Sequence, residues 1–265
     1  MSIALRIFAG YFTVVVGILG LLFNGRVVHF LKRTNYKSAY FYFCRARGFW
    51  NCLMLVVVII WIGPMTLLNT FIFPRVVEIW LLQFAFYWAY GIGPLLSFCM
   101  TINRLTAVFF PMNFKSFKGT WLTVVSQIIC SLIGASMCFY GIVNENCSQR
   151  YDLENLAWIF ESDCAYNLSV FLLYLILLSS SVGTVLNFFT FVMLARDMKR
   201  MSRIDSTAKR RHKQNLRMLI QNFILDLLYV IDMLATVFAV TWSTDPWYQF
   251  LVGTSLWLVH ITIDG

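Results

Sequence analysis

Charged residues are scarce in this sequence. Only 12% of its 265 residues are charged, 12 are Asp or Glu, and three are His, whereas 60% are hydrophobic. Soluble globular domains carry about 25% charged residues, so composition excludes an ordinary soluble fold. No polar gap between the apolar stretches is long enough for a second, soluble domain of about 50 residues.

Motifs that carry catalysis are also missing. The sequence has no glycine-rich phosphate loop, no histidines at zinc-binding spacing, and no serine or cysteine nucleophile with a matching base. We therefore expect neither an enzyme nor a metal or cofactor site. No internal repeat occurs either, so the inverted-repeat architecture of many transporters has no support.

Seven long apolar stretches dominate what is there. They cover approximately residues 7–30, 49–70, 80–103, 120–143, 168–194, 217–241 and 247–264. A hydrocarbon core needs about 20 apolar residues of helix, because no water there can satisfy the backbone. We predict an all-α polytopic membrane protein, a seven-transmembrane helix bundle forming one domain over residues 1–265.

The net charge of +9 comes from basic residues that are concentrated in alternate gaps between the apolar stretches. Eighteen of the 21 basic residues lie at or in alternate gaps: Arg26, Lys32, Arg33, Lys37, Arg45, Arg47, Arg104, Lys115, Lys118, Arg196, Lys199, Arg200, Arg203, Lys209, Arg210, Arg211, Lys213 and Arg217. The positive-inside rule then places these gaps in the cytoplasm and the amino terminus outside. Retention and contact with anionic lipids account for this charge, so we expect no nucleic acid partner.

The acidic loop after the fourth stretch holds Cys147 and Cys164. An extracellular position favours a disulfide between them, worth about 3 kcal/mol, over two unpaired thiols. Asn146 and Asn167 each begin a glycosylation sequon, although the first shares Cys147 with the bridge and the second adjoins a membrane span.

The polar residues inside the predicted spans that are candidates for a functional role are Asn24, Asp226, Asp232, His260 and Asp264. Such residues usually face the bundle interior. Four-residue spacing puts Asn222 on the face of Asp226, and His260 on the face of Asp264. The first pair predicts a local polar contact; the second predicts either structural hydrogen bonding or a proton relay. For Asn24 we expect an interhelical hydrogen bond.

Aromatic residues precede Pro94 in the third span. Pro64 and Pro94 should kink their helices. A ligand cavity bordered by Tyr87, Trp88 and Tyr90 is one interpretation, and lipid or core packing is the other.

The inner end of the third span carries Asn103 and Arg104, followed by Pro111. This stretch resembles the corresponding helix end of rhodopsin-like G-protein-coupled receptors. In that family the arginine faces the G protein, and a preceding acid restrains it. Asn103 occupies the acidic position here, so that restraint is missing. A plain interfacial anchor is the alternative role of Arg104.

A narrower resemblance is to the nematode serpentine chemoreceptors of class X. The similar features include Asn103-Arg104, the outer loop from Cys147 to Cys164, the basic run Lys209-Arg210-Arg211, Asp226 with Asp232, and His260 with Asp264-Gly265. The resemblance implies a receptor in the plasma membrane of sensory neurons. It would bind a small environmental molecule and signal to a heterotrimeric G protein through Asn103, Arg104, Arg210 and Arg211.

Two other functions stay open, a membrane transporter or ligand-gated channel and a nonfunctional truncated receptor. The seventh stretch ends at Gly265 with no basic residue nearby. About 19 residues of helix make about 28 Å, slightly short of the hydrocarbon core. We therefore expect a truncated seventh helix, with Asp264 at the inner membrane boundary.

Overall fold

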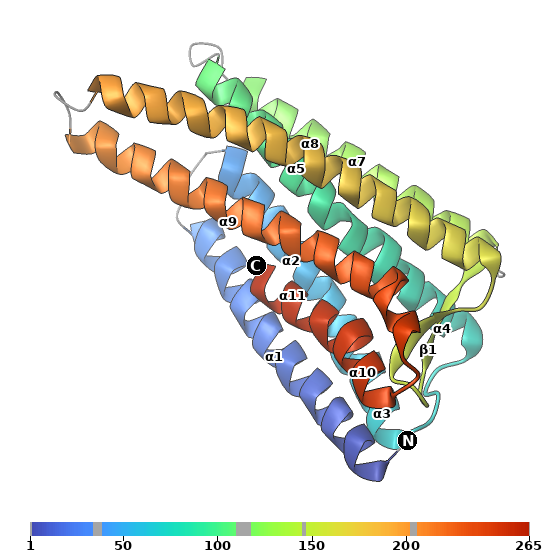
Figure 1. Ribbon diagram of the computed structural model, residues 1–265. Coiled ribbons are helices and arrows are strands. Elements are labelled where there is room, and N and C mark those ends of the chain that lie inside the picture. The colour runs from blue at the N-terminus through green and yellow to red at the C-terminus, as the bar shows by residue number, and fades with distance from the viewer. Residues whose placement is uncertain (1, 34–38, 110–117, 145–146, 202–205, 265) are drawn as a thin grey trace.

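A computed structural model describes residues 2–33, 39–109, 118–144, 147–201 and 206–264. It contains seven helical spans and one β-hairpin (Figure 1). The spans, in order, are α1 (Ile3–Arg33); α2 (Ala39–Val57), η1 (Val58–Ile62) and α3 (Gly63–Leu68); α4 (Arg75–Leu82), η2 (Gln83–Tyr90) and α5 (Gly91–Phe109); α7 (Lys118–Val143); α8 (Asp163–Met201); α9 (Ser206–Val237); and α10 (Pro246–Gln249), η5 (Phe250–Ser255) and α11 (Leu256–Asp264). A short 3₁₀ helix, η4 (Ala239–Trp242), follows α9.

The predicted seven-helix membrane bundle is confirmed, with longer helices than expected. Among the described residues, six helices are long and apolar enough to cross a membrane. The second span begins at Ala39, ten residues before the predicted start at position 49, so residues assigned to a loop are helical. Likewise α8 and α9 extend to Met201 and back to Ser206, beyond the predicted limits of 194 and 217. Much of the basic segment between the fifth and sixth predicted spans is therefore helical, as extensions of α8 and α9.

Both prolines inside spans follow a widened helical stretch. The π-helical segment η1 precedes Pro64, and η2 ends four residues before Pro94. A proline ring collides with the carbonyl four residues earlier and leaves it without a donor. Those carbonyls belong to Ile60 and Tyr90, inside or at the end of a π-helical stretch, where the extra residue per turn relieves the collision.

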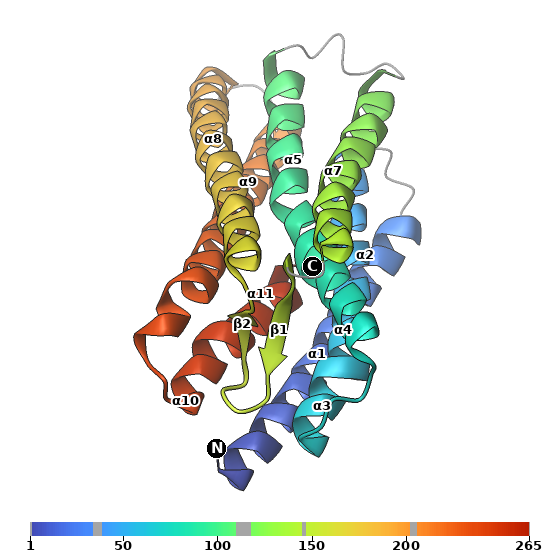
Figure 2. The ribbon, with the colours of Figure 1, turned by 90° about the vertical axis from the view of Figure 1, so that its right-hand side faces the viewer.

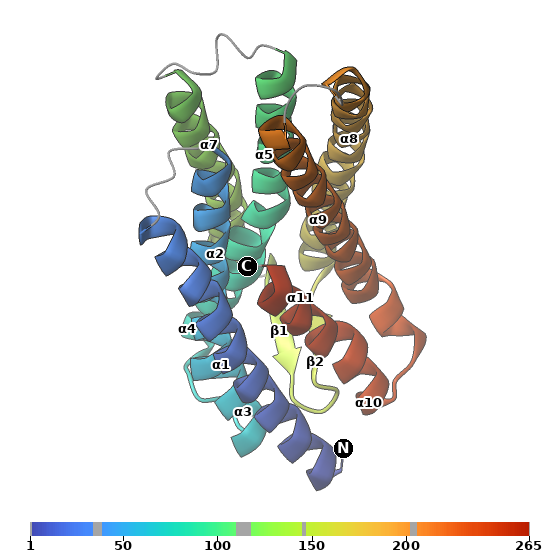
Figure 3. The same cartoon turned by 90° about the vertical axis from the view of Figure 1, so that its left-hand side faces the viewer.

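The third span is the central helix of the bundle. In its most apolar window 78% of residues are buried, against 33% in the first and fourth spans. It packs against α2, α7, α8 and α9, as Figures 2 and 3 show from opposite sides. Side chains from this span can therefore reach most other helices.

The amino terminus, α3, α10 and the hairpin gather at one end of the bundle (Figures 2 and 3). The hairpin consists of β1 (Gln149–Asp152) and β2 (Ala157–Phe160), which pair antiparallel. This is the outer end by the charge distribution, and the polar loop that was expected there is an ordered element.

Candidate functional site

The hairpin closes the outer end of the bundle. Asp152 holds its turn by accepting hydrogen bonds from the Glu154 backbone at 2.9 Å and the Asn155 amide at 2.6 Å. Leu156 adopts a left-handed conformation with φ of 55°, which a leucine tolerates only when its surroundings fix it. Its side chain is fully buried, and its carbonyl accepts a hydrogen bond from Thr254 of η5 at 2.6 Å.

Two aromatic residues of the hairpin point into the bundle. Tyr151 and Trp158 pair across the two strands and are 1% and 3% exposed. The Trp158 ring contacts Trp61 of the second span, Phe86 of the third and Trp257 of the seventh, with centroids 5.9 to 6.4 Å apart. Burial raises the pKa of the Tyr151 phenol to about 12. The hairpin is thus part of the main hydrophobic core.

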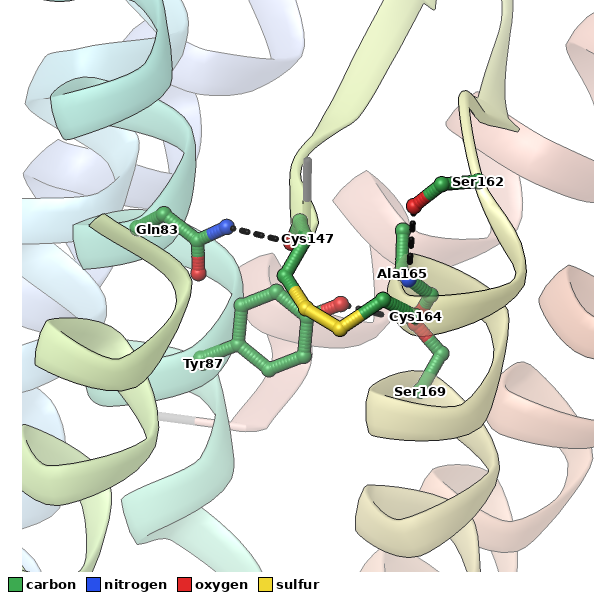
Figure 4. The surroundings of a disulfide bond; sticks show 7 residues. All are labelled: Gln83, Tyr87, Cys147, Ser162, Cys164, Ala165 and Ser169. Atoms are coloured by element: carbon green, nitrogen blue, oxygen red, sulfur yellow. Dashed lines mark hydrogen bonds between the residues drawn. A yellow bond between two sulfur atoms is a disulfide. The ribbon is translucent and has the colours of Figure 1, made fainter. Parts of the chain in front are cut away.

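A disulfide bond between Cys147 and Cys164 ties the start of the hairpin to α8 (Figure 4). The Gln83 amide donates a hydrogen bond to the Cys147 carbonyl at 3.1 Å. On the outer surface Arg75 forms an ion pair with Glu161. These contacts fix the loop to the third and fifth spans.

Below the disulfide, Tyr87, Ser169 and Gln149 form a buried hydrogen-bonded triad. The Tyr87 and Ser169 hydroxyls lie 2.8 Å apart, and the Gln149 amide donates to both, at 3.1 and 2.6 Å. Figure 4 shows Tyr87 beside the bridge. The triad links the third span, the fifth span and the hairpin.

The three aromatic residues expected around one cavity face in different directions. Tyr87 and Tyr90 are fully buried among protein groups. Trp88 instead points toward the fourth span, where its indole N–H donates to Ser131 at 3.3 Å. The structure therefore shows core packing for Tyr87 and Tyr90, whereas Trp88 lies on another side of the helix, against the fourth span.

A polar cluster of three residues lies deeper, between the third, sixth and seventh spans. The Tyr90 hydroxyl donates to Asp232 at 2.7 Å, and Nδ1 of His260 lies 3.3 Å from the same carboxylate. The expected partner of His260 was Asp264, and that pairing is wrong. His260 is 2% exposed, and its ring packs edge-on against Tyr229 with centroids 4.0 Å apart.

Asp264 forms a second buried cluster one helical turn further in. Its carboxylate pairs with Arg47 and accepts hydrogen bonds from Asn51 at 3.1 Å and Tyr229 at 3.0 Å. No basic residue lies near Asp264 in the sequence, but the fold brings Arg47 of the second span into contact with it. Four-residue spacing of Arg47 and Asn51 was the signal that could have revealed this face.

Three further polar residues take part in interhelical contacts. The Asn24 amide donates to the Gly20 carbonyl at 2.9 Å and the Ile261 carbonyl at 3.5 Å. Ser97 donates to Asp226 at 2.5 Å. Asn222 and Asp226 do not form the expected contact with each other. The Asn222 amide lies 3.3 Å from the Met100 sulfur, and Asp226 is bound by Ser97. Both side chains turn toward the central span.

Arg104 lies at the inner end of the third span. Its guanidinium lies over the Tyr40 ring, 4.6 Å from the centroid, and Nη2 lies 3.9 Å from the Met100 sulfur. It forms no ion pair with any acidic side chain that the structure describes. Asn103 is 9% exposed. The side chains of Arg210 and Arg211 lie outside the described residues.

The two glycosylation sequons lie at the two ends of the outer loop. Asn146 lies outside the described residues. Asn167 is exposed in the first turns of α8, but Ser169 of its sequon is fully buried in the hydrogen-bonded triad. Within the described part of the chain no three His, Cys, Asp or Glu residues are grouped as metal ligands.

Comparisons with known proteins agree with this architecture. A family model described as "Serpentine type 7TM GPCR chemoreceptor Srx" matches residues 14–265. No curated protein matches the sequence. The crystal structure of squid rhodopsin superposes with a TM-score of 0.76 at 12% identity, covering 100% of this chain and 80% of that chain. At that identity the likeness shows the fold alone.

Proposed function

Because the chain belongs to the class X serpentine chemoreceptor family, whose model matches residues 14–265, we propose that it is a working chemosensory receptor. It binds a small environmental molecule and activates a heterotrimeric G protein. Its place is the plasma membrane of a sensory neuron, among lipids whose anionic headgroups attract the basic inner surface.

The arrangement of Arg104 carries this proposal. The guanidinium lies at the inner end of the central span, and Nη1 has no hydrogen-bond partner. An arginine held by the Tyr40 side chain and a weakly accepting sulfur, with Nη1 unpaired, keeps strong donors for another protein. A plain membrane anchor would turn its guanidinium to lipid phosphates instead of packing it against the neighbouring helix.

The buried contacts offer a physical route between the two ends. Trp158 of the hairpin touches Trp257, which lies one helical turn before His260. His260 packs against Tyr229, and the Tyr229 hydroxyl donates to Asp264. These contacts join the hairpin to the sixth and seventh spans, so a ligand that moves the hairpin changes the same packed core.

Guanine-nucleotide exchange on a heterotrimeric G protein, with the receptor in nanodiscs, tests the proposal. Arg104→Ala should abolish the exchange that the receptor promotes, while Arg196→Ala, which removes an exposed arginine near the inner end, should leave it intact. Exchange that persists in Arg104→Ala at equal receptor content would show that Arg104 is only an anchor.

Tyr40 provides a second measurement. A cation–π contact is worth about 1 kcal/mol, so Tyr40→Leu should free Arg104 and raise unstimulated exchange by roughly 5-fold. Tyr40→Phe keeps the ring and loses only the hydroxyl, so its unstimulated exchange should stay below that of Tyr40→Leu. Equal exchange in both variants would show that the ring does not hold Arg104.

A further inference from the structure

An apolar groove runs between the third and fourth spans near the outer end. Trp80, Phe84 and Trp88 form one wall, and Cys138, Phe139 and Ile142 form the other. Its volume is about 520 Å³. Small-molecule sites usually measure about 300–1,000 Å³, so the groove can hold a ligand.

The chemistry of the lining restricts the occupant. None of the side chains that line the groove carries a charge. Trp80 and Phe139 are each 50% exposed, so the groove opens on the outside of the bundle, where the bilayer lies. A charged or strongly polar molecule would lose its hydration there without gaining a partner. A neutral, apolar molecule has little hydration to lose on entering the groove.

The direct route from the outer water into the interior of the bundle is closed. The hairpin buries Tyr151 and Trp158 in the core, and the Cys147–Cys164 bond and the Arg75 ion pair hold it. A ligand that enters the bundle interior from the outer water must displace this plug, whereas no residue of the hairpin lines the groove. A ligand dissolved in the bilayer reaches the groove without moving it.

The groove shares a helical segment with the interior. Phe84 and Trp88 belong to η2, which also carries Phe86, and the Phe86 ring contacts Trp158. Trp88 packs against the fourth span where Gly134 permits it, because a Cβ at Gly134 would lie 3.1 Å from the Trp88 ring and backbone. A ligand that displaces Trp88 therefore also displaces η2, the segment whose Phe86 contacts the hairpin. Single π-helical stretches inside α-helices often mark functional positions.

We infer that this groove binds a neutral, apolar small molecule that reaches it through the bilayer. The ligand class is hydrocarbon-rich, with at most one weak polar group, such as a terpene or a medium-chain ester. The inference rests on the proposed receptor function, because it names the class of molecule that the receptor detects.

Photolabelling of the receptor in phosphatidylcholine nanodiscs tests the site. The probe is a 12-carbon alkyl diazirine, and labelled residues are identified by mass spectrometry. Labelling of Trp80 and Phe139 should saturate with probe concentration and fall at least 10-fold when an unlabelled 12-carbon ester is in excess. Ile128 and Ile129, 52% exposed on the fourth span, should be labelled in linear proportion to the probe. Linear labelling at all four positions would show that only bilayer chains enter the groove.

Filling the groove gives a second readout. Ile142→Trp should reduce the saturable labelling at least 10-fold, whereas Leu132→Trp, at a 64% exposed position of the same helix, should not change it. The melting temperature of each variant shows that it is folded. Should Ile142→Trp distort the bundle, Val77→Trp narrows the groove from the opposite wall. Labelling that is unchanged in a folded groove variant overturns the inference.

Nucleotide exchange separates this inference from the proposed function. Saturable binding in the groove without any effect on exchange would refute the signalling role and leave the site standing. Exchange that responds to an apolar ligand equally in the parent protein and in Ile142→Trp would support the receptor and refute the groove.

Discussion

Replacing Asp264 by Asn should destabilise the protein more than replacing Arg47 by Met. The two side chains form a buried ion pair, with 4% of the Arg47 side chain and none of the Asp264 side chain exposed. Removing one partner of a buried ion pair typically costs about 3–5 kcal/mol, because the other charge is left uncompensated. Which end of that range applies depends on what surrounds the remaining group.

The structure makes the two single changes unequal. In Arg47→Met the Asp264 carboxylate keeps two donors, Asn51 at 3.1 Å and Tyr229 at 3.0 Å, and can also take up a proton. In Asp264→Asn the buried guanidinium cannot lose its proton and retains the Tyr229 ring, 5.3 Å away. We expect losses of about 3 kcal/mol for Arg47→Met and about 5 kcal/mol for Asp264→Asn. The double variant should lose less than either, because no unpaired charge stays buried.

Thermal unfolding in nanodiscs, followed by tryptophan fluorescence, measures these differences. At about 2 °C per kcal/mol, the melting temperature should fall by about 6 °C in Arg47→Met and about 10 °C in Asp264→Asn. Arg45→Met is the matched control, since Arg45 is exposed on the same helix and such changes stay within about 0.5 kcal/mol. Additive losses in the double variant, or an Arg47→Met variant that is the less stable of the two, would refute the reasoning.

Two further predictions concern the hairpin and the central span. Mass mapping of non-reduced peptides should recover Cys147 linked to Cys164, and Cys164→Ser should lower stability by about 3 kcal/mol; free thiols at both positions in alkylated surface protein would contradict this. Gly93→Ala should cost about 1–3 kcal/mol, since its Cβ would collide with the Tyr229 phenol. Gly25→Ala, with no neighbouring atom within 4 Å of the added Cβ, should be neutral or stabilising in the same melting assay.

Much of the architecture could be read from the sequence because the bilayer imposes strong local rules. The length of each apolar stretch predicted a membrane-spanning helix, and the asymmetry of Lys and Arg predicted the orientation of these helices across the membrane. Only two cysteines lie in the outer loop, which limited the choice of a bridge there to Cys147 and Cys164. The positions of Asp232, His260 and Asp264 inside spans were also predictable, because each lies within an apolar run.

What the tertiary structure decided is which of these polar groups meet. One-turn spacing suggested His260 with Asp264, yet His260 lies against Asp232 and Asp264 against Arg47. Arg47 was placed at the cytoplasmic mouth of the second span because a charge beside an apolar run normally marks the membrane boundary. Its burial depends on how deeply the second span inserts and how the seventh span is rotated. Apolar length and loop charge constrain neither quantity, because both follow from side-chain packing between helices that are distant in the sequence.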